Sequence, residues 1–346
     1  MGSRAMRIFS GIRASGEKTL GNYSGGFRQY AATQEQGEAF FCIVDLHSIT
    51  TDYEPADLRE STLSLAAMLF ATGLDPDRST VFAQSHVHAH AEAAWLLGAV
   101  TSFGELRRMT QFKEKSEQQE FVSAGLFNYP VLMVGDILLY QTDKVPVGDD
   151  QRQHVELTRN VAERFNSRYG DTFTIPEGVF PAEGARIKNL QEPERLMSTT
   201  AGNPQGVVRM IDPPDVVRKK FKTAVTDSGR DVKHAPAEKA GISNLIEIMS
   251  VVTGSGIPEL EARYDGAGYG QFKEDVGQAV IELLEPIQQR YEELRADERE
   301  LQRLLAVGAE KARKASEPTL AQMYDRMDFV RSEAGRFFGA ARPRGL

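Results

Sequence analysis

A glycine-rich turn follows the first apolar run of the sequence. Residues 11–22 read Gly-Ile-Arg-Ala-Ser-Gly-Glu-Lys-Thr-Leu-Gly-Asn and lead into a region with helical spacing. Glycines let a ligand approach the backbone closely, and the N-terminus of the following helix favours a phosphate group. The spacing matches neither the dinucleotide fingerprint nor the Walker loop, so these residues alone leave a plain strand-to-helix turn equally open.

Two further groups of side chains are candidates for chemistry. Asp136 lies between apolar runs, and a buried carboxylate needs a partner because its desolvation is costly. His86, His88 and His90 stand at alternate positions and would share one strand face, as zinc ligands can. No fourth ligand is evident and an amphipathic helix follows, so we favour surface and capping roles for these histidines.

Alternating apolar runs and helical patterns surround these residues. The runs are expected to form strands over 7–11, 39–44, 80–83 and 144–147. The segments between them are expected to form helices over 22–36, 55–72, 89–100 and 150–169. This order predicts an α/β fold, a Rossmann-type, doubly wound parallel sheet wrapped by helices.

The character of the sequence changes near residue 190. A polar loop is followed by helical segments without a convincing strand, and 271–308 is strongly helical, with Pro286 expected to kink or break it. The last helix is expected to end near Phe329, before a tail that frays. We predict a catalytic domain over 6–190, a helical domain over 191–290, a C-terminal helix that packs back over 291–335, and a tail over 336–346.

The composition limits the class of protein. The 346 residues are 41% hydrophobic and 26% charged, which is typical of a globular chain with one large domain and a smaller partner. No run approaches about eighteen apolar residues, and no apolar stretch follows the start, so we expect a cytoplasmic protein that does not enter a membrane. Cys42, the only cysteine, lies in an apolar run and is expected in the core.

The net charge of −8 argues against a general nucleic-acid coat protein, although a local basic surface would still bind one RNA. The best basic cluster is 218–222, and a solvated helix face explains it nearly as well. Trp95 and the apolar residues around it are expected either in the core or on a helix that faces a second copy.

The motifs that follow the glycine-rich turn favour a functional interpretation of it. Thr19-Leu20-Gly21-Asn22 occupies the place of the class I signature His-Ile-Gly-His. Further matches follow in family order over 43–50, 104–116, 135–140, 145–156, 224–228 and 241–245. Through these motifs the chain resembles the bacterial tryptophanyl-tRNA synthetases from residue 8 to about residue 308. The resemblance implies a symmetric homodimer that binds tryptophan and ATP, with Mg²⁺ as the ATP counterion, forms tryptophanyl-adenylate and transfers the amino acid to tRNA(Trp).

The resemblance also implies roles for individual residues. Asp136 would accept from the indole N–H, a group that can only donate. The rest of the tryptophan pocket would be Phe9, Met133 and Val145 as apolar walls, Tyr129 and Gln151 as acceptors for the α-ammonium group, and His47 and Asp150 as further lining. ATP would contact Gly11, Arg13, Ser15, Gly21, Asn22, Gly148, Arg186, Met197 and Ser198, with catalytic roles for Thr19, Asn22 and Lys115. We add Arg13 and Arg195 as catalytic candidates, although the family pattern does not have them. No protein-bound metal is implied.

Two places depart from the family pattern. The second signature, Lys-Met-Ser-Lys-Ser, falls on residues 196–200, which read Leu-Met-Ser-Thr-Thr and lack both lysines. Arg13 and Ala14 stand where bacterial members usually carry Gln and Pro. Arg13 could bind a phosphate or carboxylate and so replace part of the missing charge, could repel the α-ammonium group of tryptophan, or could face solvent. Arg195 is a further candidate replacement cation. Three hypotheses therefore stand: a working ligase with adapted loops, a specialised relative that passes activated tryptophan to another amine or hydroxyl acceptor, and a catalytically weak tryptophan-binding or regulatory protein.

Overall fold

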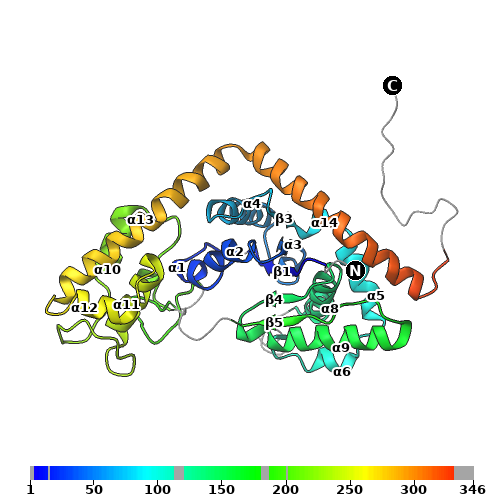
Figure 1. Ribbon diagram of the computed structural model, residues 1–346, viewed down its shortest axis with the longest axis horizontal. Helices are drawn as coiled ribbons and strands as arrows, with labels where there is room; N and C mark the ends of the chain where they lie inside the picture. The colour runs from blue at the N-terminus through cyan, green and yellow to red at the C-terminus, as the bar shows by residue number, and fades with distance from the viewer. Residues whose placement is uncertain (1–3, 15, 113–120, 181–186, 200–201, 331–346) are drawn as a thin grey trace.

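The computed structural model describes residues 4–14, 16–112, 121–180, 187–199 and 202–330 (Figure 1). At its centre is a five-stranded sheet with the order β3-β2-β1-β4-β5, in which every pairing is parallel. The strands are β1 (Arg7–Ile12), β2 (Glu38–Ile43), β3 (Ser79–Ala83), β4 (Lys144–Pro146) and β5 (Glu177–Val179). This confirms the predicted fold class. The predicted strands 7–11, 39–44, 80–83 and 144–147 match β1 to β4 within one residue at each end.

Helices surround the sheet and continue beyond it (Figure 1). Those of the sheet region are α1 (Leu20–Asn22), the π-helical η1 (Tyr23–Phe27), α2 (Arg28–Thr33), α3 (Asp45–Ser48), α4 (Pro55–Ala71), η2 (Gln84–His86), α5 (Ala89–Gly98), α6 (Phe103–Arg107), α8 (Ala124–Leu138), η3 (Asp149–Gln151) and α9 (Arg152–Tyr169). Those that follow are η4 (Pro204–Gly206), α10 (Pro214–Lys222), α11 (Ala240–Thr253), α12 (Ile257–Arg263), α13 (Tyr269–Ala296) and α14 (Glu298–Arg326).

Strand β2 shows how the sequence builds two cores. Ala39, Phe41 and Ile43 pack on the face that also meets α4 and α13, whereas Phe40 and Cys42 pack on the face that meets α5, α8 and α14. Successive side chains of a strand point to opposite faces, so a strand covered on both faces reads as a continuous apolar run. The buried position of Cys42 confirms its assignment to the core.

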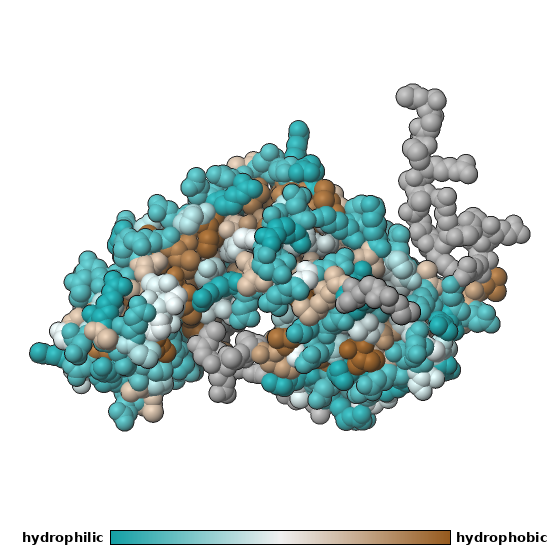
Figure 2. Space-filling model, viewed as in Figure 1, coloured by the Kyte–Doolittle hydropathy of each residue, from teal (hydrophilic) through white to brown (hydrophobic). Residues whose placement is uncertain are grey.

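The long helices α13 and α14 cross the whole molecule and join the helical region to the sheet (Figure 1). Hydrophobic residues show along this crossing on an otherwise mainly hydrophilic face (Figure 2). Of the two alternatives expected at Pro286, a kink or a break, the break is wrong, because α13 runs through this proline on its exposed side. The chain breaks instead at Asp297, whose side chain accepts a hydrogen bond from Glu300 N and caps α14.

Helix α14 packs on β3, α4 and α5, and it ends at Arg326, three residues before the expected Phe329. The predicted boundary at residue 290 falls inside α13, and the division into domains stays a prediction. Within the described ranges no single helix is long and apolar enough to cross a membrane, and only the sharply bent pair α11 and α12 passes by length and composition.

Candidate functional site

A cavity of about 850 Å³ opens at the carboxyl ends of β1 and β4, where the strand order reverses. Ligands of open α/β sheets bind at this point. The cavity gathers all the residues implied to bind tryptophan, namely Phe9, His47, Tyr129, Met133, Asp136, Val145, Asp150 and Gln151, together with Gly11, Arg13 and Gly148 from the implied ATP contacts. The structure thus brings these residues to one place, and their roles toward a ligand stay predictions.

Asp136 of α8 is the buried charge of this cavity, with only 1% of its surface exposed. Its Oδ2 accepts from His47 Nε2 at 2.9 Å, and its Oδ1 accepts from both Gln84 Nε2 and His90 Nδ1 at 2.6 Å. Burial raises the pKa of this carboxyl group, but the hydrogen bonds from His47 and His90 outweigh burial and lower the pKa to about 2. Asp136 is therefore a carboxylate at neutral pH.

A polar group occupies another part of the cavity wall. The Tyr129 hydroxyl donates to Gln111 Oε1 at 3.2 Å, and Gln111 Nε2 and Gln151 Nε2 both donate to Asp150 Oδ2, at 3.2 and 2.6 Å. His154 Nε2 is 3.0 Å from the Tyr129 hydroxyl. This group offers oxygen acceptors of the kind that an ammonium group needs.

The glycine-rich turn is held by its own side chains. Thr19 Oγ1 accepts from Asn22 N at 3.3 Å, and Thr19 N donates to Asn22 Oδ1 at 2.9 Å, which makes a reciprocal cap at the start of α1. A Cβ atom on Gly21 would lie 3.2 Å from Met197 O, and one on Gly16 would lie 3.4 Å from Thr199 Oγ1. The turn therefore faces the loop that replaces the second signature.

Two cations lie in this turn. Arg13 Nη2 donates to Thr51 Oγ1 at 3.0 Å, while Arg13 Nε is buried and has no hydrogen-bond partner among the described residues. Lys18 Nζ donates to Arg13 O at 3.1 Å. Burial and the nearby Arg13 charge lower the pKa of Lys18 to about 8, and burial lowers the pKa of Arg13 while Tyr129 acts against it. Two partly desolvated cations at one turn favour an anionic ligand.

The remaining predicted ATP contacts lie apart from the cavity lining or outside the described part of the chain. Met197 is buried, and its sulfur accepts from Val208 N at 3.4 Å, whereas Arg195 is exposed. Neither these two residues nor Ser198 lines the cavity, as far as the described residues show. Ser15, Lys115 and Arg186 lie outside the described residues.

The prediction for the histidines is wrong in one case. His90 is fully buried and bonded to Asp136, whereas His86 and His88 are exposed. The signal was present in the helical spacing, because His90 shares the buried face of α5 with Ala93 and Leu97. Within the described ranges no group of three or more His, Cys, Asp or Glu side chains is placed to hold a metal ion.

Sequence reasoning also missed or misplaced other residues. Gln84 lies outside the matched motifs. Gln111 and Tyr140 lie within them and Lys18 lies in the glycine-rich turn, but no role was predicted for these three residues. All four are recognised only by their partners in space. Trp95 is 84% exposed, so the core alternative is wrong and the alternative of a helix that faces a second copy stays a prediction. In the basic cluster, Lys220 is largely buried against Asp212, which removes it from any open basic face.

Comparison with known proteins gives a consistent result. The model of the family "tRNA synthetases class I (W and Y)" matches residues 1–285. A tryptophan–tRNA ligase 2 of Streptomyces avermitilis is 49% identical over 95% of this chain and 99% of its own length. A tryptophan–tRNA ligase of Listeria monocytogenes is 52% identical over 91% of this chain and 95% of its own length.

Solved structures agree. Tryptophanyl-tRNA synthetase from Mycoplasma pneumoniae superposes with a TM-score of 0.84 at 35% identity, covering 94% of this chain and 98% of that one. The enzyme from Campylobacter jejuni, complexed with ADP and tryptophan, gives 0.82 at 32% identity, covering 94% and 100%. The cavity at the reversal of the strand order, the paired signature loops and these likenesses lead to one conclusion: the chain belongs to the class I tRNA synthetases for tryptophan and tyrosine, among the bacterial tryptophanyl-tRNA synthetases.

Proposed function

We propose that the protein is a tryptophan–tRNA ligase that activates tryptophan with ATP and transfers it to tRNA(Trp) in the cytoplasm. The observation that carries this proposal is a buried carboxylate, Asp136, that lines the cavity together with the apolar side chains of Phe9, Met133 and Val145. An indole ring needs apolar walls and one acceptor for its N–H. The relatives that are 49% and 52% identical in sequence to this chain carry the name tryptophan–tRNA ligase.

The polar side chains of the cavity wall would fix the orientation of the bound substrate. With the indole N–H on Asp136, the α-ammonium group would meet oxygen acceptors of Tyr129, Gln151 and Asp150. The α-carboxylate would then face the glycine-rich turn. This orientation supports a reaction between the carboxylate and a nucleotide bound at that turn.

We propose that ATP binds between the glycine-rich turn and the facing loop, with Mg²⁺ as its counterion. The tryptophan carboxylate oxygen attacks the α-phosphorus, the bond to the β-phosphate oxygen breaks, and pyrophosphate leaves with the bonding electrons. The step is limited mainly by positioning and by stabilisation of charge on the leaving group. Gly21 supports this placement because its missing side chain lets the turn approach Met197.

Arg13 and Lys18 would supply part of the positive charge that the second signature lacks. Arg13 lines the cavity with a buried Nε that has no hydrogen-bond partner among the described residues, and Lys18 is held against its backbone. A phosphate or carboxylate oxygen near them would relieve the repulsion between two desolvated cations. We keep Lys115 and Arg195 as further candidates.

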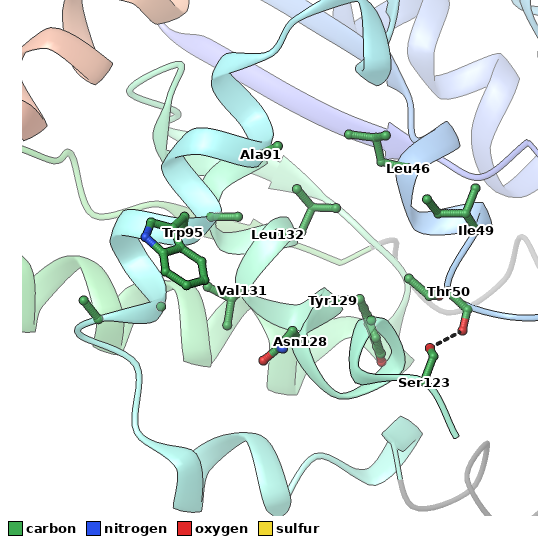
Figure 3. A pocket seen from close by; sticks show the side chains of 14 residues that line it. Leu46, Ile49, Thr50, Ala91, Trp95, Ser123, Asn128, Tyr129, Val131 and Leu132 are labelled. Atoms are coloured by element: carbon green, nitrogen blue, oxygen red, sulfur yellow. Dashed lines mark hydrogen bonds between the residues drawn. The ribbon is translucent and has the colours of Figure 1, made fainter. Parts of the chain in front are cut away.

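A second cavity supports a symmetric homodimer as the working form. It has a volume of about 840 Å³ and is lined mainly by apolar side chains of α5 and α8, including Trp95 and Leu132 (Figure 3). Thr50 and Tyr129 line both cavities. We propose that a second copy covers this surface, because a hollow lined mainly by apolar side chains, next to a Trp95 that is 84% exposed, suits an interface between identical chains. The substrate pocket would then abut the partner.

One observation favours the second candidate function, a specialised relative that passes activated tryptophan to another acceptor. Leu196 is 54% exposed and Thr199 faces Gly16, at the positions where the family places its lysines.

Calorimetry with tryptophan and tyrosine, followed by pyrophosphate exchange, tests the proposed function. We expect tryptophan to bind and to support exchange and tyrosine to do neither. Equal binding of the two amino acids would overturn the pocket assignment.

A further inference from the structure

The carboxylate of Asp136 is held almost entirely by the protein. An ionised carboxylate has about four acceptor sites on its two oxygens. Gln84 and His90 both donate to Oδ1, and His47 donates to Oδ2. With the donors of the described residues in place, one acceptor site is left, on Oδ2, and Asp136 itself lines the cavity.

His90 is the member of this group that lies deepest. None of its surface is exposed, and it does not line the cavity. Its Nδ1 lies 2.6 Å from Asp136 Oδ1, and its Nε2 lies 2.8 Å from the Tyr140 hydroxyl. An ionised carboxylate only accepts, so His90 donates through Nδ1. Both ring nitrogens are thus fixed, and the ring cannot turn without losing a buried hydrogen bond.

Tyr140 ties this arrangement to the rest of the fold. Its ring stacks on Phe9, a wall of the cavity, with centroids 5.4 Å apart, and packs on Phe40 of β2 at 4.6 Å. A continuous set of contacts therefore runs from Asp136 through His90 and Tyr140 to Phe9 and strand β2.

We propose that His90, together with Gln84, is a positioning residue for substrate selection: the two side chains fill Oδ1 of Asp136 and so leave Oδ2 as the only oxygen open to a donor on the substrate. Neither residue needs to touch the substrate for this effect. The inference rests on the proposed function, because the donor in question is the indole N–H of tryptophan. It predicts that His90 controls the preference for an N–H group, beyond any contribution to stability.

The test compares tryptophan with β-(3-benzothienyl)alanine, in which sulfur replaces the N–H. The readout is the ratio of the two dissociation constants, measured by calorimetry on the full chain. In the parent we expect tryptophan to bind at least about ten-fold more tightly, as is usual for a hydrogen bond to a charged acceptor. His90→Leu should reduce this ratio at least about five-fold, because Oδ1 then becomes available and the carboxylate is free to turn.

Two matched variants separate positioning from packing. In His90→Asn the side-chain amide stands where Nδ1 stood, so it should keep the parent's ratio within about two-fold while losing the bond to Tyr140. Phe82→Leu removes a ring whose centroid lies 5.8 Å from that of His90 without touching a hydrogen bond to Asp136, so it should lower stability and leave the ratio unchanged.

A further variant serves if His90→Leu does not fold. Gln84→Met removes the second donor to Oδ1, and it also removes Gln84 Oε1, which is buried and has no hydrogen-bond partner among the described residues. It too should reduce the ratio. Parallel weakening of both ligands in His90→Leu and Gln84→Met, with the parent's ratio kept, would overturn the positioning role and leave the proposed function intact. A parent without any preference for tryptophan would overturn both.

Discussion

The absent lysines of the second signature offer the sharpest way to alter the rate of adenylate formation. The double change Leu196→Lys with Thr199→Lys restores both ammonium groups at the loop that faces the glycine-rich turn. Leu196 is already largely exposed, and Thr199 lies beside Gly16, so neither lysine has to be buried. We expect the variant to fold as the parent does.

The structure limits the size of the gain. Unit charges about 4 Å apart near a protein surface interact by about 4 kcal/mol, and exposure and salt reduce this value. Leu196 is 54% exposed, so its replacement would remain well solvated. Arg13 and Lys18 already place positive charge in the turn and would repel further cations. We therefore expect a gain of about 1.4 kcal/mol in the transition state, which is about ten-fold in rate.

The assay is pyrophosphate exchange at saturating tryptophan, with the tryptophan affinity measured separately. A rise of about ten-fold at nearly constant affinity is expected when interactions are added in the transition state. The control is Leu196→Met with Thr199→Gln, which adds length without charge and should leave the rate near that of the parent. A fall in exchange in the lysine variant would refute the reasoning, because the loop would then be adapted to work without lysines.

Three further predictions concern charge and surface. Asp136→Asn should lower the free energy of unfolding at pH 7 by about 2 kcal/mol in urea titrations, because the folded pKa of about 2 lies below the ordinary 3.8. This stabilisation is present above about pH 4 and is lost as the pH falls toward 2. Equal stability of the variant and the parent at pH 7 would contradict the prediction. The KM for ATP should rise as the pH increases through about 8, where Lys18 loses its proton, and Arg13→Gln should move this rise to higher pH; a flat profile would remove Lys18 from the site. Trp95→Glu should convert a dimer to a monomer in sedimentation, while an unchanged mass would exclude the α5–α8 surface as the interface.

The sheet could be predicted because its strands carry their signal locally. β2 is apolar on both faces, and the runs of β1 to β4 were all located within one residue. β5 has three residues, none of them buried, so no apolar pattern marked it. Pro286 misled the prediction because its missing N–H leaves the carbonyl of Glu282, four residues earlier, without a helical donor. Both residues lie on the exposed side of α13, where water can bind that carbonyl and the proline is tolerated.

The residues that line the cavity could be predicted, whereas the side chains that hold them in place could not. Motif resemblance located the residues that line the cavity, but it carried no information on which side chains hold them. The local sequence around His90 predicts a surface histidine. Only the packing of α5 on α8 places its ring beside Asp136. Gln84 and Tyr140 come from separate elements and become partners only through tertiary packing.

Incubation of the purified protein with labelled tryptophan and ATP, with and without tRNA(Trp), tests the proposed reaction most directly. AMP, tryptophanyl-adenylate and acylated tRNA are scored together. We expect adenylate to form without tRNA, and AMP and tryptophanyl-tRNA to accumulate in equal amounts when tRNA is added. Adenylate that forms and is never transferred to tRNA would contradict the ligase assignment and favour a different acceptor, and the absence of any adenylate would contradict activation itself.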